Sequence, residues 1–330
     1  MTADTWVIAC YANPLGFRTR RRNFHYFAEA LRAQNANLLV VEMTGPDGAF
    51  ELDGHDFAVV RLRGNGFIWQ KERMLNVALS HLPSTCRKVV WADADVLFEN
   101  DEWLGATSRA LEQYTVVQPF ESCVRLPVGH LRFQGETQEG TEVMPSFAAC
   151  FRSDPTLAVT ERFRHHGHTG FAWAARRELL EDCSLYDACI TGSGDHLMAH
   201  VFAGTLNSRC IPAMLGEGNA FARHFSRWAM IAHEKFRGRL GFVPGRLLHL
   251  WHGSMLNRRY THRNHELGEL GFDPERDIRL DAGGVWEWSA ASDPLREWSE
   301  AGFRSRDEDA ELAEQEAERH AEPVTGASHR

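Results

Sequence analysis

Short apolar runs alternate with amphipathic stretches through the first third of the chain. The runs that predict strands are residues 5–12, 37–43 and 57–62. Apolar residues then recur at helical spacing at Phe24, Phe27, Ala28 and Leu31. A second amphipathic helix is predicted from Ile68 to Leu82, ending before Pro83. Strands that alternate with helices predict an α/β fold: a mostly parallel sheet flanked by helices in a single large domain.

A fourth apolar run leads directly into two carboxylates. Val89 to Ala92 predicts a short strand buried on both faces, and Asp93-Ala94-Asp95 follows it. Burying both charges unpaired is costly, so we expect the strand to end here with a dication such as Mg2+ or Mn2+ on the carboxylates. The alternative is a solvated turn with two ordinary acids. The strand and helix that precede the turn favour the metal site.

The remaining chain predicts further strands at residues 115–120, 170–175 and 247–251. Residues 121–165 are polar and interrupted by Gly and Pro, which predicts a loop or insertion. The histidines His165, His166 and His168 lie at its end and just beyond, at a spacing that fits no zinc motif. A solvent-facing loop cluster is at least as good an interpretation of them.

Composition and cysteine usage narrow the class of protein. The 330 residues, of which 43% are apolar and 25% charged, are ordinary for a globular protein. The first apolar run follows no basic segment, and no apolar stretch reaches roughly 18 residues, so neither a signal peptide nor a membrane span is predicted. Seven scattered cysteines without a C-x-x-C pair indicate reduced thiols and therefore a cytoplasmic protein.

Charge is distributed unevenly along the chain, whose formal net charge is −9. Residues 307–330 carry eight acids and two arginines, a net −6, whereas residues 221–263 carry a net +8. The basic segment predicts an anionic ligand on that half, or else a solvated basic face balanced by the acidic tail. Residues 304–330 predict a frayed helix and a disordered end.

Two later stretches carry candidate chemistry. The glycine-rich turn Thr191–His196 places Asp195 at a helix start, where it either caps the helix or presents a carboxylate to a cleft. On the turn alone, capping is favoured. The strand at residues 247–251 delivers His249 and His252 to its end. Because side chains alternate across a strand, we expect at most one of these two histidines at a given site.

Taken in order, these motifs resemble a known family. Trp69–Val77, followed by Trp91–Val96, resembles the donor-binding half of GT-A glycosyltransferases, and most closely the F-N-R-A-K-L-L-N-V helix and D-V-D strand end of the β-1,4-galactosyltransferase family. Four further segments are similar to that family. Gly16–Arg20 is similar to its F-R-N-R loop, and Gly170–Trp173 to its G-G strand. Gly192–His196 is similar to its W-G-G-E-D turn, and His252-Gly253 to the histidine that completes its metal site. Retaining polypeptide N-acetylgalactosaminyltransferases have a counterpart of this region. The whole pattern also resembles a bacterial and phage-type group of glycosyltransferase-like proteins.

This resemblance implies inverting, metal-dependent transfer of a hexosyl group from a nucleotide sugar, a UDP-sugar first of all, to a hydroxyl of a glycan or other acceptor. The residues implied to hold Mn2+ or Mg2+ are Asp93, Asp95 and His252. Those implied to bind the donor are Arg18, Arg20, Lys71, Arg73 and Asp93. Asp195 is implied to be the general base, and the acceptor-side residues are Trp173, Gly194, His196 and His249. The acidic turn departs from the family because it has a single carboxylate and lacks the tryptophan, so sugar and acceptor specificity are not carried over.

The implied organisation has a nucleotide-sugar-binding half at residues 1–120 and an acceptor-side, metal-completing half at residues 166–303. Two other functions compete with the sugar transferase. One is a non-catalytic binder of a nucleotide sugar or carbohydrate. The other is a phage-type enzyme that glycosylates a hydroxymethylated base of a nucleic acid, which the basic segment and its aromatic residues permit. Those aromatics are Phe225, Trp228, Phe236 and Phe242.

Overall fold

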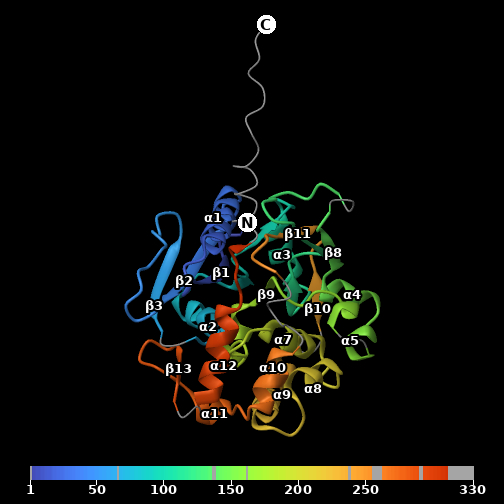
Figure 1. Cartoon of the computed structure of the whole chain (residues 1–330). Helices are drawn as coiled ribbons and strands as arrows, with labels where there is room; N and C mark the ends of the chain where they lie inside the picture. Colours follow the sequence, from blue (N-terminus) through green and yellow to red (C-terminus); the bar gives the residue numbers. More distant parts are fainter. Residues whose placement is uncertain are drawn as a thin grey trace.

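A seven-stranded sheet lies at the centre of the computed structural model, which describes residues 2–64, 67–135, 139–160, 163–236, 239–254, 262–289 and 293–310. The strand order is β10-β6-β9-β4-β1-β2-β3, with helices around the sheet (Figure 1). Neighbouring strands are parallel except that β9 lies antiparallel between β4 and β6. The predicted α/β fold with a mostly parallel sheet is therefore confirmed. The strands are β1 (Thr5–Ala12), β2 (Asn37–Thr44), β3 (Ala58–Arg63), β4 (Lys88–Ala92), β6 (Val116–Gln118), β9 (Ala172–Arg176) and β10 (Leu240–Phe242).

Alternating side chains of the central strands divide the core between the two faces of the sheet. Ile8 of β1 packs on one face with residues of α2 (Lys71–His81), whereas Val7 packs on the other face with residues of α1 (Arg18–Ala33). Because helices cover both faces, these strands are apolar at nearly every position. The other helices are α3 (Trp103–Ala110), α4 (Phe147–Ser153), α5 (Leu157–Thr160), η1 (Phe163–His166), α6 (Arg177–Cys183), α7 (Gly194–Ala203), α8 (Cys210–Leu215), α9 (Ala220–Phe236), α10 (Arg263–Glu269), α11 (Pro274–Asp277) and α12 (Asp293–Arg304).

A second, four-stranded sheet has the order β5-β11-β7-β8. Its strands are β5 (Val96–Phe98), β7 (Ser122–Arg125), β8 (Glu142–Pro145) and β11 (Arg246–His249). Residues 121–165, which we expected to be a loop, thus supply two of these strands as well as α4, α5 and η1. A short antiparallel pair, β12 (Ile278–Leu280) and β13 (Trp286–Trp288), completes the strands of the described ranges.

The first part of the acidic tail is ordered against the first helix, contrary to our expectation for residues 304–330. The Glu308 side chain is 1% exposed and forms an ion pair with Arg20. The Asp309 carboxylate accepts hydrogen bonds from the backbone N–H groups of Arg18 (2.8 Å) and Thr19 (2.8 Å) at the start of α1. Composition alone did not reveal these contacts, since each acid has a specific partner far away in the sequence. Residues 311–330 lie outside the described ranges.

We expect Glu308→Ala to lower the free energy of unfolding by about 3–5 kcal/mol, because it leaves the largely buried Arg20 guanidinium without its carboxylate. Urea denaturation of the two proteins would measure this difference. The neighbouring exposed acid supplies the matched control, Asp307→Asn, which should unfold like the parent protein. Equal midpoints for Glu308→Ala and Asp307→Asn would show that the ion pair adds nothing to stability.

The basic segment at residues 221–263 does not present its aromatic residues for stacking. Phe225 and Phe236 of α9 are buried, and the Trp228 indole packs on Tyr186. Phe242 is half-buried and packs against the core. Several of the basic side chains are paired with acids elsewhere: Arg227 with Glu275, Lys235 with Asp182 and Arg246 with Glu99. The aromatic argument for a nucleic-acid acceptor is therefore wrong. Arg237, Arg258 and Arg259 lie outside the described residues.

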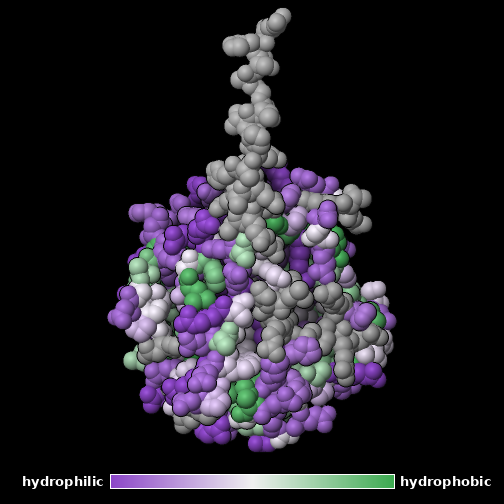
Figure 2. All heavy atoms as spheres, viewed as in Figure 1, coloured by the Kyte–Doolittle hydropathy of each residue, from purple (hydrophilic) through white to green (hydrophobic). Residues whose placement is uncertain are grey.

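The visible surface is predominantly polar. Figure 2 shows hydrophilic side chains over most of the face viewed, with small and separate apolar patches. Among the described residues, no helix has both the length and the apolar character needed to cross a bilayer.

Candidate active site

A cleft of about 1240 Å³ lies at the carboxyl ends of β1, β2 and β4. Ligands of parallel α/β sheets bind at this edge, where the strands end and the loops begin. Most small-molecule sites occupy about 300–1,000 Å³, so this cleft has room for a large ligand or for two ligands. Its lining comes from segments spread over nearly the whole described chain, which include residues 10–16, 43–46, 67–72, 93–95, 167–171, 192–193, 195–196, 249, 252, 263, 303, 306 and 308.

Asp95, His249 and His252 converge on one wall of the cleft. The Asp95 Oδ2 atom lies 3.8 Å from His249 Nε2 and 3.6 Å from His252 Nε2, and the three potential ligand atoms all lie within 4.8 Å of one another. Backbone pairing sets this arrangement, because β5 and β11 pair with Val96 opposite His249, and the Leu250 N–H donates to the Asp95 carbonyl. One carboxylate and two imidazoles form a candidate site for a divalent cation.

Our expectation that only one of the two histidines would face the site is wrong. β11 ends at His249, so the strict alternation of a strand no longer applies to the residues that follow. His252 lies three residues after His249, beyond the end of the strand, and its Nε2 atom approaches the same Asp95 Oδ2 atom as that of His249. The edge-on contact of the two rings, with centroids 4.5 Å apart, places both beside Asp95.

Asp93 lies near the same wall but has a different partner. Its carboxylate forms an ion pair with Lys71 from the first turn of α2, and Lys71 Nζ also lies 3.5 Å from Asp195 Oδ2. Burial opposes the charged form of Lys71, but the two carboxylates outweigh burial and hold its pKa well above the usual value. Lys71 is therefore an ammonium that joins Asp93 to Asp195. Asp93 does not belong to the cluster of Asp95, His249 and His252.

Asp195 lies in the first turn of α7, facing the cleft. The N-cap position belongs to Ser193, and the Asp195 Oδ1 atom accepts a hydrogen bond of 2.9 Å from the backbone N–H of His196. A Cβ atom at Gly170 would come within 2.7 Å of Asp195 Oδ2, so a larger residue there would displace this carboxylate. We expected Asp195 to be the N-cap residue of this helix, and that interpretation is wrong. Its side chain nevertheless accepts a hydrogen bond from the backbone of the first turn.

Two non-glycine residues with left-handed backbones border this carboxylate. Ser193 has a φ of +67° and Phe171 a φ of +78°. Such conformations cost on the order of 1–3 kcal/mol each and cluster at functional sites. The Phe171 ring stacks between His168 (3.8 Å between centroids) and His249 (4.5 Å), and its carbonyl accepts from the Asp93 N–H. Phe171 therefore helps to position Asp93 through this hydrogen bond and His249 through the ring contact.

The arginines implied to bind the donor have different positions. Arg20 lines the cleft, and its guanidinium is held by Glu308. Arg18 points outward, with 62% of its side chain exposed. Arg73 lies on the opposite side of α2 from Lys71, because two residues advance a helix by about 200°, and it pairs with Asp187 at 3.2 Å. Arg18 and Arg73 are therefore not in the cleft lining.

Two of the four residues implied on the acceptor side, Trp173 and Gly194, are not in the cleft lining. Trp173 is 1% exposed in β9 and packs against Phe202, so it is a core residue. Gly194 is buried, and a Cβ atom there would lie 2.9 Å from the carboxyl carbon of Glu72. His196 does line the cleft, and its ring lies beside those of His166 and His200. His249 lies with Asp95 and His252 in the candidate cation site, which we call the cation wall.

Sequence reasoning missed a polar network on the other side of the cleft. The Glu51 carboxylate accepts hydrogen bonds from the Tyr11 hydroxyl, from Asn13 Nδ2 at 3.2 Å and from Arg21 Nε at 3.0 Å. Burial, together with the hydrogen bond to Glu51, raises the pKa of Tyr11. Arg21 directly follows the Gly16–Arg20 segment, whereas Glu51 gave no signal because it lies in an irregular segment.

Sequence reasoning also missed Glu72, which is 2% exposed beside Lys71. Burial raises the pKa of Glu72 to about 8, against the attraction of Lys71, whereas a glutamate in the unfolded chain titrates near 4.5. Between these values the folded protein binds one more proton than the unfolded chain. The contribution of Glu72 to stability is therefore fully present below pH 4.5 and is lost as the pH rises to about 8.

Glu72→Gln removes this titration with little change of shape. We expect the variant to be close in stability to the parent at about pH 4.5 and increasingly more stable than the parent as the pH rises to about 8. Thermal unfolding of both proteins across this range measures the difference. A constant difference between the two melting temperatures at all pH values would contradict the raised pKa.

Comparison with known proteins gives matches at the level of fold only. No protein-family model matches the sequence, and no curated protein matches it. Drosophila β1,4-galactosyltransferase 7, solved with manganese, UDP-Gal and xylobiose, is 10% identical with a TM-score of 0.36, over 89% of this chain and 98% of that one. The 4-diphosphocytidyl-2C-methyl-D-erythritol synthase of Anaerococcus prevotii is 9% identical with a TM-score of 0.35, over 73% and 90% of the two chains. At these values, no shared activity follows.

Proposed function

We propose that the protein is a metal-dependent glycosyltransferase that moves a hexosyl group from a nucleotide sugar, in the first place a UDP-sugar, to an acceptor hydroxyl. One observation carries the proposal. A candidate cation cluster (Asp95, His249 and His252) and a cleft-facing carboxylate (Asp195) lie in one large cleft at the carboxyl ends of parallel strands. The resemblance of the sequence motifs to GT-A enzymes supports the same assignment.

Asp95 and His252, joined by His249, are the residues that would hold the cation. This mixed set of oxygen and nitrogen atoms suits Mn2+ better than Mg2+, which prefers oxygen ligands and near-ideal octahedral geometry. When bound, the cation would neutralise charge on the diphosphate of the leaving nucleotide. Asp93 would meet the donor together with Lys71 instead of serving as a metal ligand.

Asp195 would accept the proton of the acceptor hydroxyl, as the general base of an inverting reaction. The Lys71 ammonium orients this carboxylate from 3.5 Å and adds positive charge near the donor phosphates. On the other side of the cleft, Tyr11, Asn13 and Glu51 offer hydrogen-bonding groups for the ribose or base. The left-handed backbones of Ser193 and Phe171 fix the geometry before substrates arrive.

A donor screen tests the proposal. The full chain is incubated with Mn2+ and a panel of nucleotide sugars, and slow hydrolysis of the donor is followed by nucleotide release. We expect hydrolysis of one donor class, its suppression by EDTA and its restoration by added Mn2+. Saturable donor binding without hydrolysis or transfer would favour the non-catalytic binder. Absence of both binding and hydrolysis for every nucleotide sugar would overturn the proposal.

A further inference from the structure

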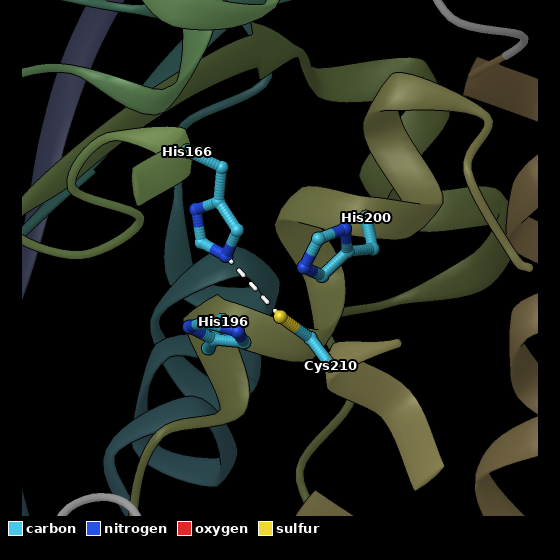
Figure 3. Close-up of side chains that lie close together, drawn as sticks. All are labelled: His166, His196, His200 and Cys210. Carbon is cyan, nitrogen blue, oxygen red and sulfur yellow. Dashed lines mark hydrogen bonds between the residues drawn. The ribbon is translucent and has the colours of Figure 1, made fainter. Parts of the chain in front are cut away.

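A second group of ligating side chains lies behind the cleft, buried in the protein. His166 of η1, His196 and His200 of α7, and Cys210 at the start of α8 place one ligand atom each within 4.8 Å of the others. Figure 3 shows the three imidazoles arranged around the sulfur of Cys210. The cluster shares no residue with the cation wall (Asp95, His249 and His252) or with the Lys71–Asp195 pair.

One of the separations between these atoms already equals that of two ligands around one small ion, and the others are at most 4.8 Å. His166 Nε2 lies 3.3 Å from Cys210 Sγ, and the three ring centroids are 5.1, 5.1 and 5.3 Å apart. Zinc bonds of about 2.0–2.1 Å to nitrogen and about 2.3 Å to sulfur imply ligand separations of about 3.3–3.6 Å in a tetrahedron. His196 and His200, four residues apart on α7, occupy neighbouring positions on one face of the helix.

The outer nitrogens of the imidazoles are already engaged, as in known metal sites. His196 Nδ1 meets the Thr169 hydroxyl at 3.2 Å, His200 Nδ1 meets the Thr205 hydroxyl at 3.2 Å, and His166 Nδ1 meets the Gly167 carbonyl at 3.1 Å. Metal-binding histidines almost always use their second nitrogen in this way, which fixes the orientation of the ring. Within the described residues, the buried Nε2 atom of His200 has no hydrogen-bond partner.

An ordinary polar core explains this arrangement less well. A buried polar atom without a partner is destabilising, and here it lies among aromatic side chains, with the Phe147 ring edge-on to His166 and His200 at 5.3 Å each. Bringing three imidazoles and a thiol to one point desolvates all four groups. A cation at that point would satisfy all of them together.

We propose that His166, His196, His200 and Cys210 form a closed, tetrahedral Zn2+ site. Three nitrogens and one sulfur suit Zn2+ and exclude the oxygen-preferring Mg2+. Since four protein ligands complete the tetrahedron and leave no open position, the site is structural. Binding converts the Cys210 thiol to a thiolate and releases its proton to solvent. The ion would fasten the start of α7, which carries Asp195 next to His196, to η1 and α8.

Metal analysis of the full chain, purified without chelators and without a histidine tag, tests this site. We expect about one zinc per chain in the parent protein and a loss of most of it in His200→Ala and in Cys210→Ser. The matched controls are Cys189→Ser, another buried free thiol, and His224→Ala, a half-buried histidine elsewhere; both should keep the zinc. Asp95→Ala should also keep it, which separates this site from the cation wall and from the proposed transferase activity.

Cobalt substitution tests the site in the parent protein and so does not depend on whether the variants fold. The parent protein, refolded with Co2+, should show the intense visible bands of tetrahedral Co2+ and a thiolate-to-metal charge-transfer band. Zinc-free parent protein that also gives no such spectrum would overturn the proposal. So would zinc that is kept in both His200→Ala and Cys210→Ser.

Discussion

Asp195→Asn should lower turnover by about 10²–10⁴-fold, the range that general bases typically contribute. Asparagine preserves the shape of the side chain and its hydrogen bond to the first turn of α7, but it cannot take a proton. Folding and donor binding should therefore survive. Initial rates of sugar transfer or donor hydrolysis, together with donor titration by calorimetry, measure the two properties separately.

The matched control is Asp187→Asn. Asp187 is also a largely buried carboxylate paired with a cation, Arg73 at 3.2 Å, but it lies outside the cleft lining. The Asp187→Asn variant tests whether loss of a buried ion pair alone lowers turnover. Assayed below its melting temperature, this variant should retain most of the activity. Near-normal turnover in Asp195→Asn would restrict Asp195 to a structural role and leave the base unassigned.

Asp95→Ala should abolish metal-dependent turnover and weaken Mn2+ binding by more than about 10²-fold, since even outer contacts of metal ligands account for 10–100-fold. Asp95 is the proposed oxygen ligand of the cation and, at a strand end, it is not part of the apolar core. Electron paramagnetic resonance of free Mn2+ measures binding without requiring activity. The fold should remain largely intact.

The neighbouring carboxylate provides the comparison. Because Asp93 pairs with Lys71, Asp93→Asn should keep most of the Mn2+ affinity while weakening donor binding. Equal losses of Mn2+ affinity in Asp95→Ala and Asp93→Asn would show that both acids are ligands. Activity that persists in EDTA would remove the metal from the mechanism.

Features that depend on local sequence were predicted well. The apolar run Val89–Ala92 does form a buried strand, and Asp93 and Asp95 do lie at its end in the cleft. The alternation of strands and helices predicted the parallel sheet correctly, because each of these strands and helices has a recognisable hydrophobic periodicity. The antiparallel position of β9 was not predicted, since strand order depends on pairing between distant segments.

Features that depend on direction or on distant partners were not predicted. Arg73 looked like a donor contact from its position in the motif, yet the phase of α2 turns it toward Asp187. Trp173 alternates into the core. Glu308 finds Arg20 across most of the chain, and no local pattern marks that pair. The spacing of His196 and His200 was visible in the sequence, but their partners, His166 and Cys210, come from other segments.

The pairing of β5 with β11 also bears on when the candidate cation site can assemble during folding. Asp95 and His249 are separated by nearly half of the chain, and they meet only through this long-range pairing. Contacts of such high sequence separation form slowly, since the intervening chain must first be closed into a loop. An early folding intermediate built from the first four strands of the large sheet would lack two of the three cation ligands. During refolding, Mn2+ uptake would therefore follow the late docking of β11 and not the initial collapse.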